Sequence, residues 1–151
     1  MTTKRILVPL DGRERAEAVV PVVAALARDA GAAVRLVRIF SVPSEVITPQ
    51  GWMVASVDQE MARLESRALS DFAPAEIALA GLPVETVVRY GEPAEEIARE
   101  AEAFGADLIA LTAGRRGRLR AALAPALAQR LQKRTHTPTL VLYTGADGST
   151  T

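Results

Sequence analysis

The chain lacks cysteine and is poor in histidine and aromatic residues. Its 151 residues include no cysteine, one histidine and 4% aromatic residues. The absence of cysteine excludes disulfides, thiolate metal sites and cysteine nucleophiles, and a single histidine cannot build a multi-histidine metal site. We therefore expect no metal site in this protein.

Long apolar runs are also missing. No apolar segment approaches the roughly 20 residues that a membrane-spanning helix requires, and the first residues show no signal-peptide cleavage pattern. We expect a cytoplasmic protein with no membrane partner. With 49% hydrophobic and 24% charged residues, the composition is that of an ordinary globular protein. The length favours one domain, expected over residues 1–144, followed by a disordered tail over residues 145–151.

Short apolar runs alternate with segments of helical periodicity. Residues 6–10 form a continuous apolar run that ends at Asp11-Gly12, which is typical of a strand buried in a parallel sheet. Helical spacing predicts a helix over residues 14–30, with a bend at its interior Pro21, and a second helix closed by Pro74. Further strands are predicted over 34–40, 84–90, 108–111 and 139–143, and further helices over 93–104 and up to Arg134.

This alternation predicts an α/β fold, a doubly wound five-stranded parallel sheet with helices on both faces. The strand of residues 6–10 should be central. The predicted core residues are Val8, Leu36, Val37, Val87, Ile109 and Val141. The segment 41–53 is predicted as a long loop, with Trp52, Met53 and Met61 as core and loop-anchoring residues. Ligands should bind at the carboxyl ends of the first, second and fourth strands, beside the point where the strand order reverses.

Few residues are candidates for chemistry. Asp11 follows the first strand, where a ligand-binding carboxylate would lie, but an Asp-Gly turn needs no function, and both interpretations stay open. His136 is interpreted as structural or exposed. The glutamates of residues 92–96 are expected at a helix N-terminus because of the helix dipole, and we assign them no catalysis.

The C-terminal third is basic. No acidic residue lies between Asp107 and Asp147, whereas seven arginines and lysines fall there. This segment is either a solvated helix face or an anion-binding surface. Within it, residues 114–117 (Gly-Arg-Arg-Gly) loosely resemble a phosphate loop, because they follow a buried strand and precede a helix.

Four segments together resemble the universal stress protein family, in the family's order and spacing. They are Ile6–Gly12, Gly91–Ile97, Gly105–Ile109 and Pro138–Leu142. The resemblance implies a flavodoxin-like sandwich with strand order 3-2-1-4-5, usually a homodimer. It implies a role in stress survival without an agreed reaction, and binding of ATP by only some members.

The resemblance also implies where a nucleotide would bind. In members that bind ATP, the aspartate after the first strand contacts the nucleotide, and backbone near the end of the second strand meets the adenine. Asp11, preceded by Pro9 and Leu10, matches the first feature, and Ile39 falls at the second. The third feature is a Gly-x2-Gly-x9-Gly-Ser/Thr motif that holds ribose and phosphates.

This third feature is changed here. An ungapped alignment puts Thr112 and Arg115 at the first two glycines and Pro125-Ala126 at the final Gly-Ser, while a shifted alignment uses the glycines of residues 114–117. Pro125 has no N–H and Ala126 has no hydroxyl for a phosphate at the expected helix start, so ATP binding should be weak or absent. The candidate nucleotide-binding residues are Pro9, Leu10, Asp11, Ile39, Thr112, Gly114, Arg115, Arg116, Gly117, Pro125 and Ala126.

Three functions stay open at this point. The first is a non-enzymatic universal stress protein that acts through an unknown protein partner or a weakly held ligand, with no required cofactor. The second is a switch that binds ATP and Mg²⁺, with slow hydrolysis and with arginines replacing the glycine cradle. The third is a nucleic-acid binder, which the scarcity of aromatic residues disfavours.

The last strand should lie at an edge of the sheet and pair with a second copy. Unpaired apolar edges are usually covered, and an antiparallel pair of identical strands is symmetric. The expected homodimer interface is Thr139, Leu140, Val141, Leu142 and Tyr143.

Overall fold

A computed structural model describes residues 3–11, 18–114 and 118–144 of the chain. The elements are β1 Arg5–Leu10, α1 Val19–Ala30, β2 Ala33–Phe40, β3 Val46–Ile47, β4 Met53–Ala55, α2 Val57–Ala78, β5 Val84–Tyr90, α3 Pro93–Phe104, β6 Leu108–Gly114, α4 Arg118–Arg134 and β7 Thr139–Thr144. Five parallel strands form one sheet in the order β5-β2-β1-β6-β7. This is the predicted order, with β1 central. The predicted tail beyond Thr144 lies outside the described residues.

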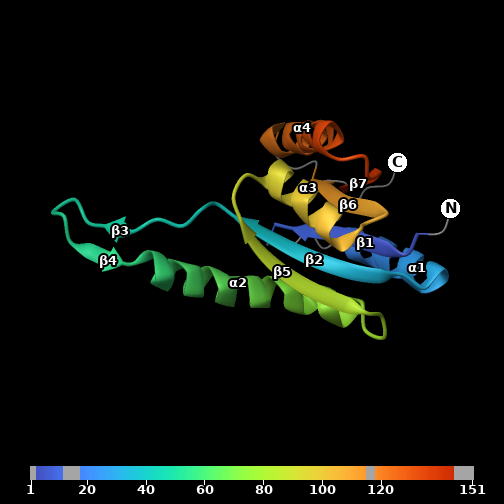
Figure 1. Ribbon diagram of the computed structural model, residues 1–151, viewed down its shortest axis with the longest axis horizontal. Coiled ribbons are helices and arrows are strands. Elements are labelled where there is room, and N and C mark those ends of the chain that lie inside the picture. The colour runs from blue at the N-terminus through green and yellow to red at the C-terminus, as the bar shows by residue number, and fades with distance from the viewer. Residues whose placement is uncertain (1–2, 12–17, 115–117, 145–151) are drawn as a thin grey trace.

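Two helices cover each face of the sheet (Figure 1). Successive side chains of a strand point to opposite faces, and both faces carry apolar side chains that must be buried. Val8 and Leu36 pack with α1 and α2, whereas Val37 and Ile109 pack with α3 and α4. These four predicted core residues are fully buried. The other two, Val87 and Val141, are partly buried against the α3 side. Over the part of the chain that is described, no helix has the length and apolarity to cross a membrane.

Pro21 and Pro74 do not have the effects on their helices that the sequence predicted. Pro21 lies in the first turn of α1, where a helix leaves its N–H groups unpaired, so the bend predicted there is not required. Residues 14–17 of the predicted helix lie outside the described residues. Pro74 lies inside α2, so the prediction that it closes the helix is wrong. Continuing past Pro74 buries Ala75 and Leu79 against the core, and this burial offsets the unfavourable proline.

Strands β1 and β6 separate near their carboxyl ends. They pair only at Ile6↔Leu108 and Leu7↔Ile109. The Arg5 carbonyl accepts a hydrogen bond from the backbone N–H of Asp107, so the backbone groups of Arg5 face β6. Because this direction alternates along a strand, the backbone groups of Pro9 face β6 as well. Because Pro9 has no N–H, it cannot continue this ladder. The strands part at the point where the strand order reverses.

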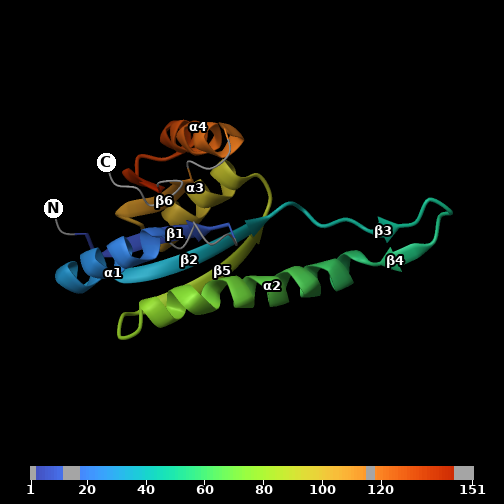
Figure 2. The ribbon, with the colours of Figure 1, turned by 180° about the vertical axis from the view of Figure 1, so that it is seen from behind.

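The segment after β2 is not the loop that the sequence predicted. Strands β3 and β4 form an antiparallel hairpin that projects beyond the carboxyl end of the sheet (Figures 1 and 2). Trp52 is 73% exposed and Met53 is 59% exposed, so the interpretation of these two residues as core or loop anchors is wrong. Met61, in α2, is partly buried. The hairpin is exposed because it extends past the helices that cover the sheet.

Candidate functional site: a pocket at the switch point

A pocket of about 240 Å³ lies where β1 and β6 part. The ends of β1, β2 and β6 form its floor, and the first turns of α3 and a residue of α4 close it from one face of the sheet. Its lining residues are Pro9, Leu10, Asp11, Arg38, Ile39, Pro93, Ile97, Leu111, Thr112 and Leu127. This is the place where the fold predicts a ligand, at the carboxyl ends of the strands beside the switch point.

The walls of the pocket are mainly apolar, and its two charged lining residues differ in environment. Asp11 is exposed. Arg38 is only 8% exposed, and its Nε donates to Asp71 Oδ2 on α2 at 2.9 Å. The Arg38 guanidinium also lies 4.3 Å from the centre of the Phe40 ring. These contacts hold Arg38 against α2, so it ties β2 to that helix.

The structure brings together five of the predicted nucleotide-binding residues. Pro9, Leu10, Asp11, Ile39 and Thr112 all line the pocket, although they come from three strands. Residues Arg115, Arg116 and Gly117 lie outside the described residues. Asp11 therefore lines a pocket, which favours the ligand-binding interpretation of this carboxylate over that of a simple turn former.

The loop after β6 differs from the expectation. The strand was predicted to end at Leu111, but it continues to Gly114 because these residues pair with β7. Thr112 lies opposite Leu142 in this ladder, so the position that one alignment gives to the family's first glycine is strand. A β-branched residue favours the strand conformation here.

The placement of Pro125 and Ala126 is also corrected. Helix α4 begins at Arg118, so Pro125 lies in its interior and cannot mark a phosphate-binding helix start. Ala126 is exposed and is not among the lining residues of the pocket, whereas the next residue, Leu127, is. The expected loss of donors at a helix N-terminus through Pro125 and Ala126 was therefore wrong. The sequence pattern gave no signal for the earlier start, because the helix begins within a run of arginines.

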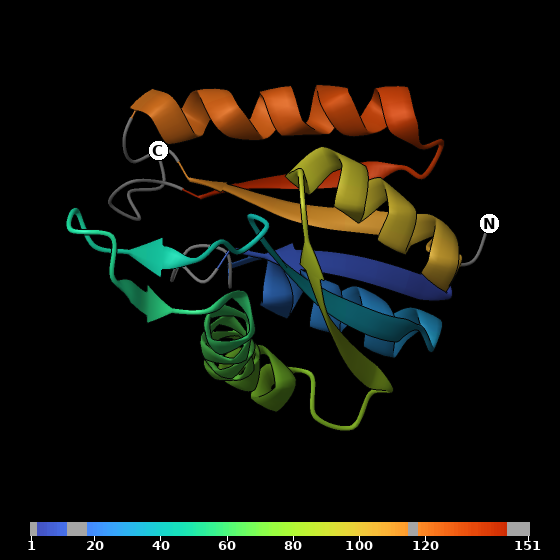
Figure 3. The same ribbon diagram turned by 60° about the vertical axis from the view of Figure 1, so that its left-hand side comes forward.

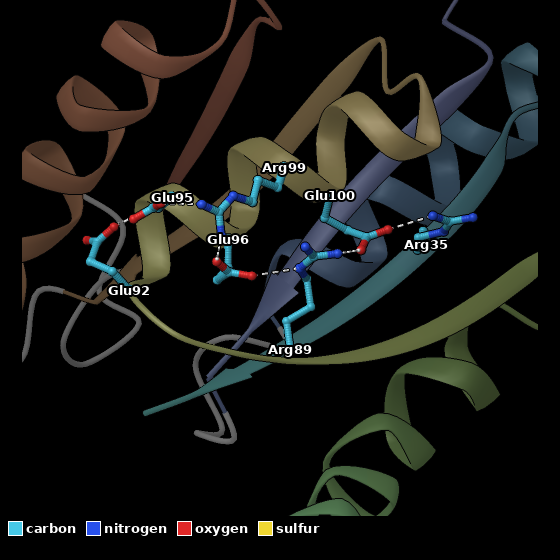
Figure 4. A network of polar contacts seen from close by, with 7 residues as sticks. All are labelled: Arg35, Arg89, Glu92, Glu95, Glu96, Arg99 and Glu100. Atoms are coloured by element: carbon cyan, nitrogen blue, oxygen red, sulfur yellow. Dashed lines mark hydrogen bonds and ion pairs between the residues drawn. The ribbon is translucent and has the colours of Figure 1, made fainter. Parts of the chain in front are cut away.

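Buried ion pairs hold α3 against the sheet (Figure 4). Glu100 is 2% exposed and accepts hydrogen bonds from Arg35 Nη1 at 2.5 Å and Arg89 Nη1 at 2.7 Å. Glu96 is 7% exposed and accepts from Arg89 Nε at 3.0 Å and from Arg99 Nη1 at 2.6 Å. Because Pro93 and Ile97 line the pocket from the same helix, this network fixes one wall of the site.

The network also sets the ionisation of its arginines. Burial alone would lower the pKa of Arg35, but its hydrogen bonds with Glu100 and Glu85 outweigh that effect and raise the pKa above its ordinary value. The pKa of Arg89 is raised in the same way by Glu96 and Glu100. Both guanidinium groups are therefore charged throughout the usable pH range.

The other polar residues singled out by the sequence have structural positions. Glu92 caps α3, because its side chain accepts from the backbone N–H of Glu95 at 2.7 Å, and it also pairs with Arg130. This agrees with the interpretation of these glutamates as helix-start residues. His136 is exposed. Across residues 3–11, 18–114 and 118–144, no three histidine, aspartate or glutamate side chains come together as metal ligands would.

A parallel sheet with helices on both faces and an apolar pocket at its switch point defines the class of doubly wound α/β domains. The model of the Universal stress protein family matches residues 2–142. The chain belongs to the universal stress protein family, as the sequence segments indicated.

Solved structures share the fold at low sequence identity. Hypothetical protein MJ0577 superposes with a TM-score of 0.72 at 21% identity, over 95% of this chain and 98% of that one. A universal stress protein in complex with cAMP gives 0.66 at 18% identity, over 95% and 99% of the two chains. The universal stress protein from Archaeoglobus fulgidus in complex with dAMP gives 0.53 at 20% identity, over 93% and 98%. A search of curated proteins finds no match.

Proposed function

We propose that this chain is a non-enzymatic universal stress protein whose switch-point pocket holds an adenine nucleotide weakly, through the base and sugar more than through the phosphates. The observation that carries this proposal is the pocket itself, with apolar walls and the carboxylate of Asp11 among its lining residues. The two structural neighbours solved with cAMP and dAMP support this ligand class.

The pocket suits the base and sugar for reasons of shape and polarity. Apolar side chains such as Ile39, Ile97 and Leu127 can pack on the faces of a purine ring, while Asp11 and backbone groups supply the few polar contacts that fix orientation. The volume of about 240 Å³ lies below the roughly 300–1,000 Å³ of pockets that enclose a whole drug-sized ligand. A triphosphate would extend outside it.

The lining near the phosphate side supports weak binding of ATP. Thr112 places a branched side chain at the position that one alignment gives to a glycine, and glycine is the residue that allows backbone to approach a phosphate closely. Pairing of β6 with β7 as far as Gly114 extends the strand through this region in place of a turn. Neither feature depends on Pro125.

Calorimetric titration with AMP, cAMP and ATP at physiological salt tests the proposal. We expect measurable binding of AMP, and ATP within about threefold of AMP because its extra phosphates gain little. Asp11→Ala should weaken AMP binding at least about tenfold, the loss of one hydrogen bond to a charged group. Asp29→Ala, at the exposed end of α1, is the matched control and should bind like the unmodified protein. ATP binding in the low-micromolar range, or tenfold tighter than AMP, would favour the arginine-cradle switch instead.

We also propose that the protein is a homodimer through β7. This strand is at the edge of the sheet, and its central residues Leu140, Val141 and Leu142 are partly buried in the single chain. The carbonyl of Pro138 accepts from Ile109, so by alternation Val141 directs its backbone groups away from β6, toward a second copy. Val141→Pro removes an N–H at that edge. It should reduce the mass measured by light scattering at micromolar concentration, whereas a monomeric unmodified protein would contradict the proposal.

A further inference from the structure

The hairpin after β2 is an apolar projection from the body of the protein. We call residues 41–56 the arm (Figures 1 and 2); it contains β3 and β4. Figure 3 shows it leaving the sheet beside the first turn of α2. Its exposed apolar residues and their exposed fractions are Val42 70%, Val46 43%, Ile47 54%, Trp52 73%, Met53 59% and Val54 63%. Glu45 is the one charged residue in this segment.

This surface has the properties of an interface that lacks its partner. A hairpin of two strands is at best marginally stable alone in water, and three or more strands or a packing surface are needed to stabilise it. In the arm, β3 pairs only with β4, so each strand has an edge that no other strand of the described chain covers. Apolar strands with uncovered edges are prone to pair with another chain.

We propose that the arm binds the arm of a second copy of this chain across a two-fold axis. An occupant of this surface must be as uncharged and as apolar as the arm, because burying a charge against it without a counter-charge would be costly. The arm meets this requirement, and antiparallel pairing of two identical strands is self-complementary.

The area of the arm fits this occupant. From their exposed fractions, the six apolar residues expose on the order of 700 Å² on each copy, which is the upper limit of the apolar area that they could bury in a contact between two arms and is close to the roughly 800 Å² per partner of a standard interface. In Figures 1 and 2 the arm projects beyond the carboxyl ends of the strands, away from the body of the sheet in which β7 lies. The contact between two arms is therefore a second interface, and where both form, the assembly contains more than two chains.

Mass and fluorescence test this contact. Trp52 is the single tryptophan of the chain and lies in the arm, so its emission should shift to shorter wavelength as the protein concentration rises and the arms associate. Val54→Glu places two like charges at the contact and should at least halve the mass from sedimentation velocity. Ile77→Glu is the matched control, because Ile77 is 77% exposed on α2 and outside the arm; its mass should equal that of the unmodified protein.

Cross-linking gives an independent measurement, because the chain has no cysteine of its own. Val54→Cys should form a disulfide-linked dimer on mild oxidation at least tenfold faster than Ile77→Cys. Circular dichroism and thermal melting of each variant show whether the body remains folded.

Equal masses for the Val54→Glu and Ile77→Glu variants, or equal cross-linking rates, would overturn the proposal. It would also be overturned if Val54→Glu changed nucleotide affinity without changing the mass, because the arm would then be a cover for its own pocket. Because the expected change is a halving of whatever mass the unmodified protein has, the result does not depend on the β7 dimer.

Discussion

Neutralising Glu100 should destabilise the protein more than any other single neutralisation on α3. The side chain of Glu100 is 3% exposed, and it accepts from Arg35 and Arg89, whose side chains are 18% and 27% exposed. Glu100→Gln keeps the shape of the side chain but removes the charge that both guanidinium groups face. The guanidinium groups of Arg35 and Arg89 would then both face a neutral amide in a partly buried environment, without the negative charge that compensated them.

The magnitude follows from how far the arginines are compensated elsewhere. Removing one partner of a fully buried ion pair costs about 3–5 kcal/mol. Arg35 retains Glu85 at 3.2 Å and Arg89 retains Glu96 at 3.0 Å, and both arginines are partly hydrated, which reduces that cost. We expect Glu100→Gln to lower the free energy of unfolding by about 2 kcal/mol.

Equilibrium unfolding in urea measures this difference, and an unchanged slope would show that the unfolded state is unaffected. Glu102→Gln is the matched control, because Glu102 lies two residues further along α3 on its exposed side. This change should alter the free energy of unfolding by less than about 0.5 kcal/mol. If Glu100→Gln cost no more than Glu102→Gln, the reasoning that buried charge pairs hold α3 would be refuted.

Two further predictions concern the end of β5, the strand at the other edge of the sheet from β7. Gly91→Ala should destabilise the protein by about 1–3 kcal/mol in the same urea assay. The reason is that Gly91 has φ = 144°, and a Cβ there would lie 3.0 Å from Glu96 Cγ. Gly51 is also at positive φ but has open space around it, so Gly51→Ala should cost less. Burial, followed by the negative charge of Glu65, raises the pKa of Tyr90, so the folded state keeps this proton longer than the unfolded state does. Stability should therefore fall as the pH rises above about 10, and Tyr90→Phe should reduce that fall; an identical pH dependence in the two proteins would contradict the assignment.

The sequence was sufficient for the fold because its signals are local. The apolar run of residues 6–10, the αL glycines at the ends of α1 and α3 and the proline at the start of α3 each reflect the conformation of a few neighbouring residues. The order of these elements then leaves few topologies for a parallel sheet. The sequence also predicted that Asp11 and Ile39 lie beside each other, because both are located at the carboxyl ends of neighbouring strands.

The walls of the pocket could not be predicted in this way. Pro93, Ile97 and Leu127 reach the site through the packing of α3 and α4, which depends on contacts between residues far apart in sequence. One local signal existed: Pro9 has no N–H, so one of the two hydrogen-bond ladders of its strand must be interrupted there. Only the structure shows that the interrupted ladder is the one to β6.

Tertiary structure also decided three features that local patterns misjudged. Burial of Ala75 and Leu79 carries α2 past Pro74, pairing with β7 carries β6 past Leu111, and the arm is exposed because it extends past the helices. In each case the local conformational preference of the segment contributes about 1–3 kcal/mol to the free energy of folding, and burial or strand pairing with distant residues contributes a similar amount. The sequence alone determined which elements form and in what order, whereas contacts between distant residues decided where each element ends and which side chains meet in the pocket.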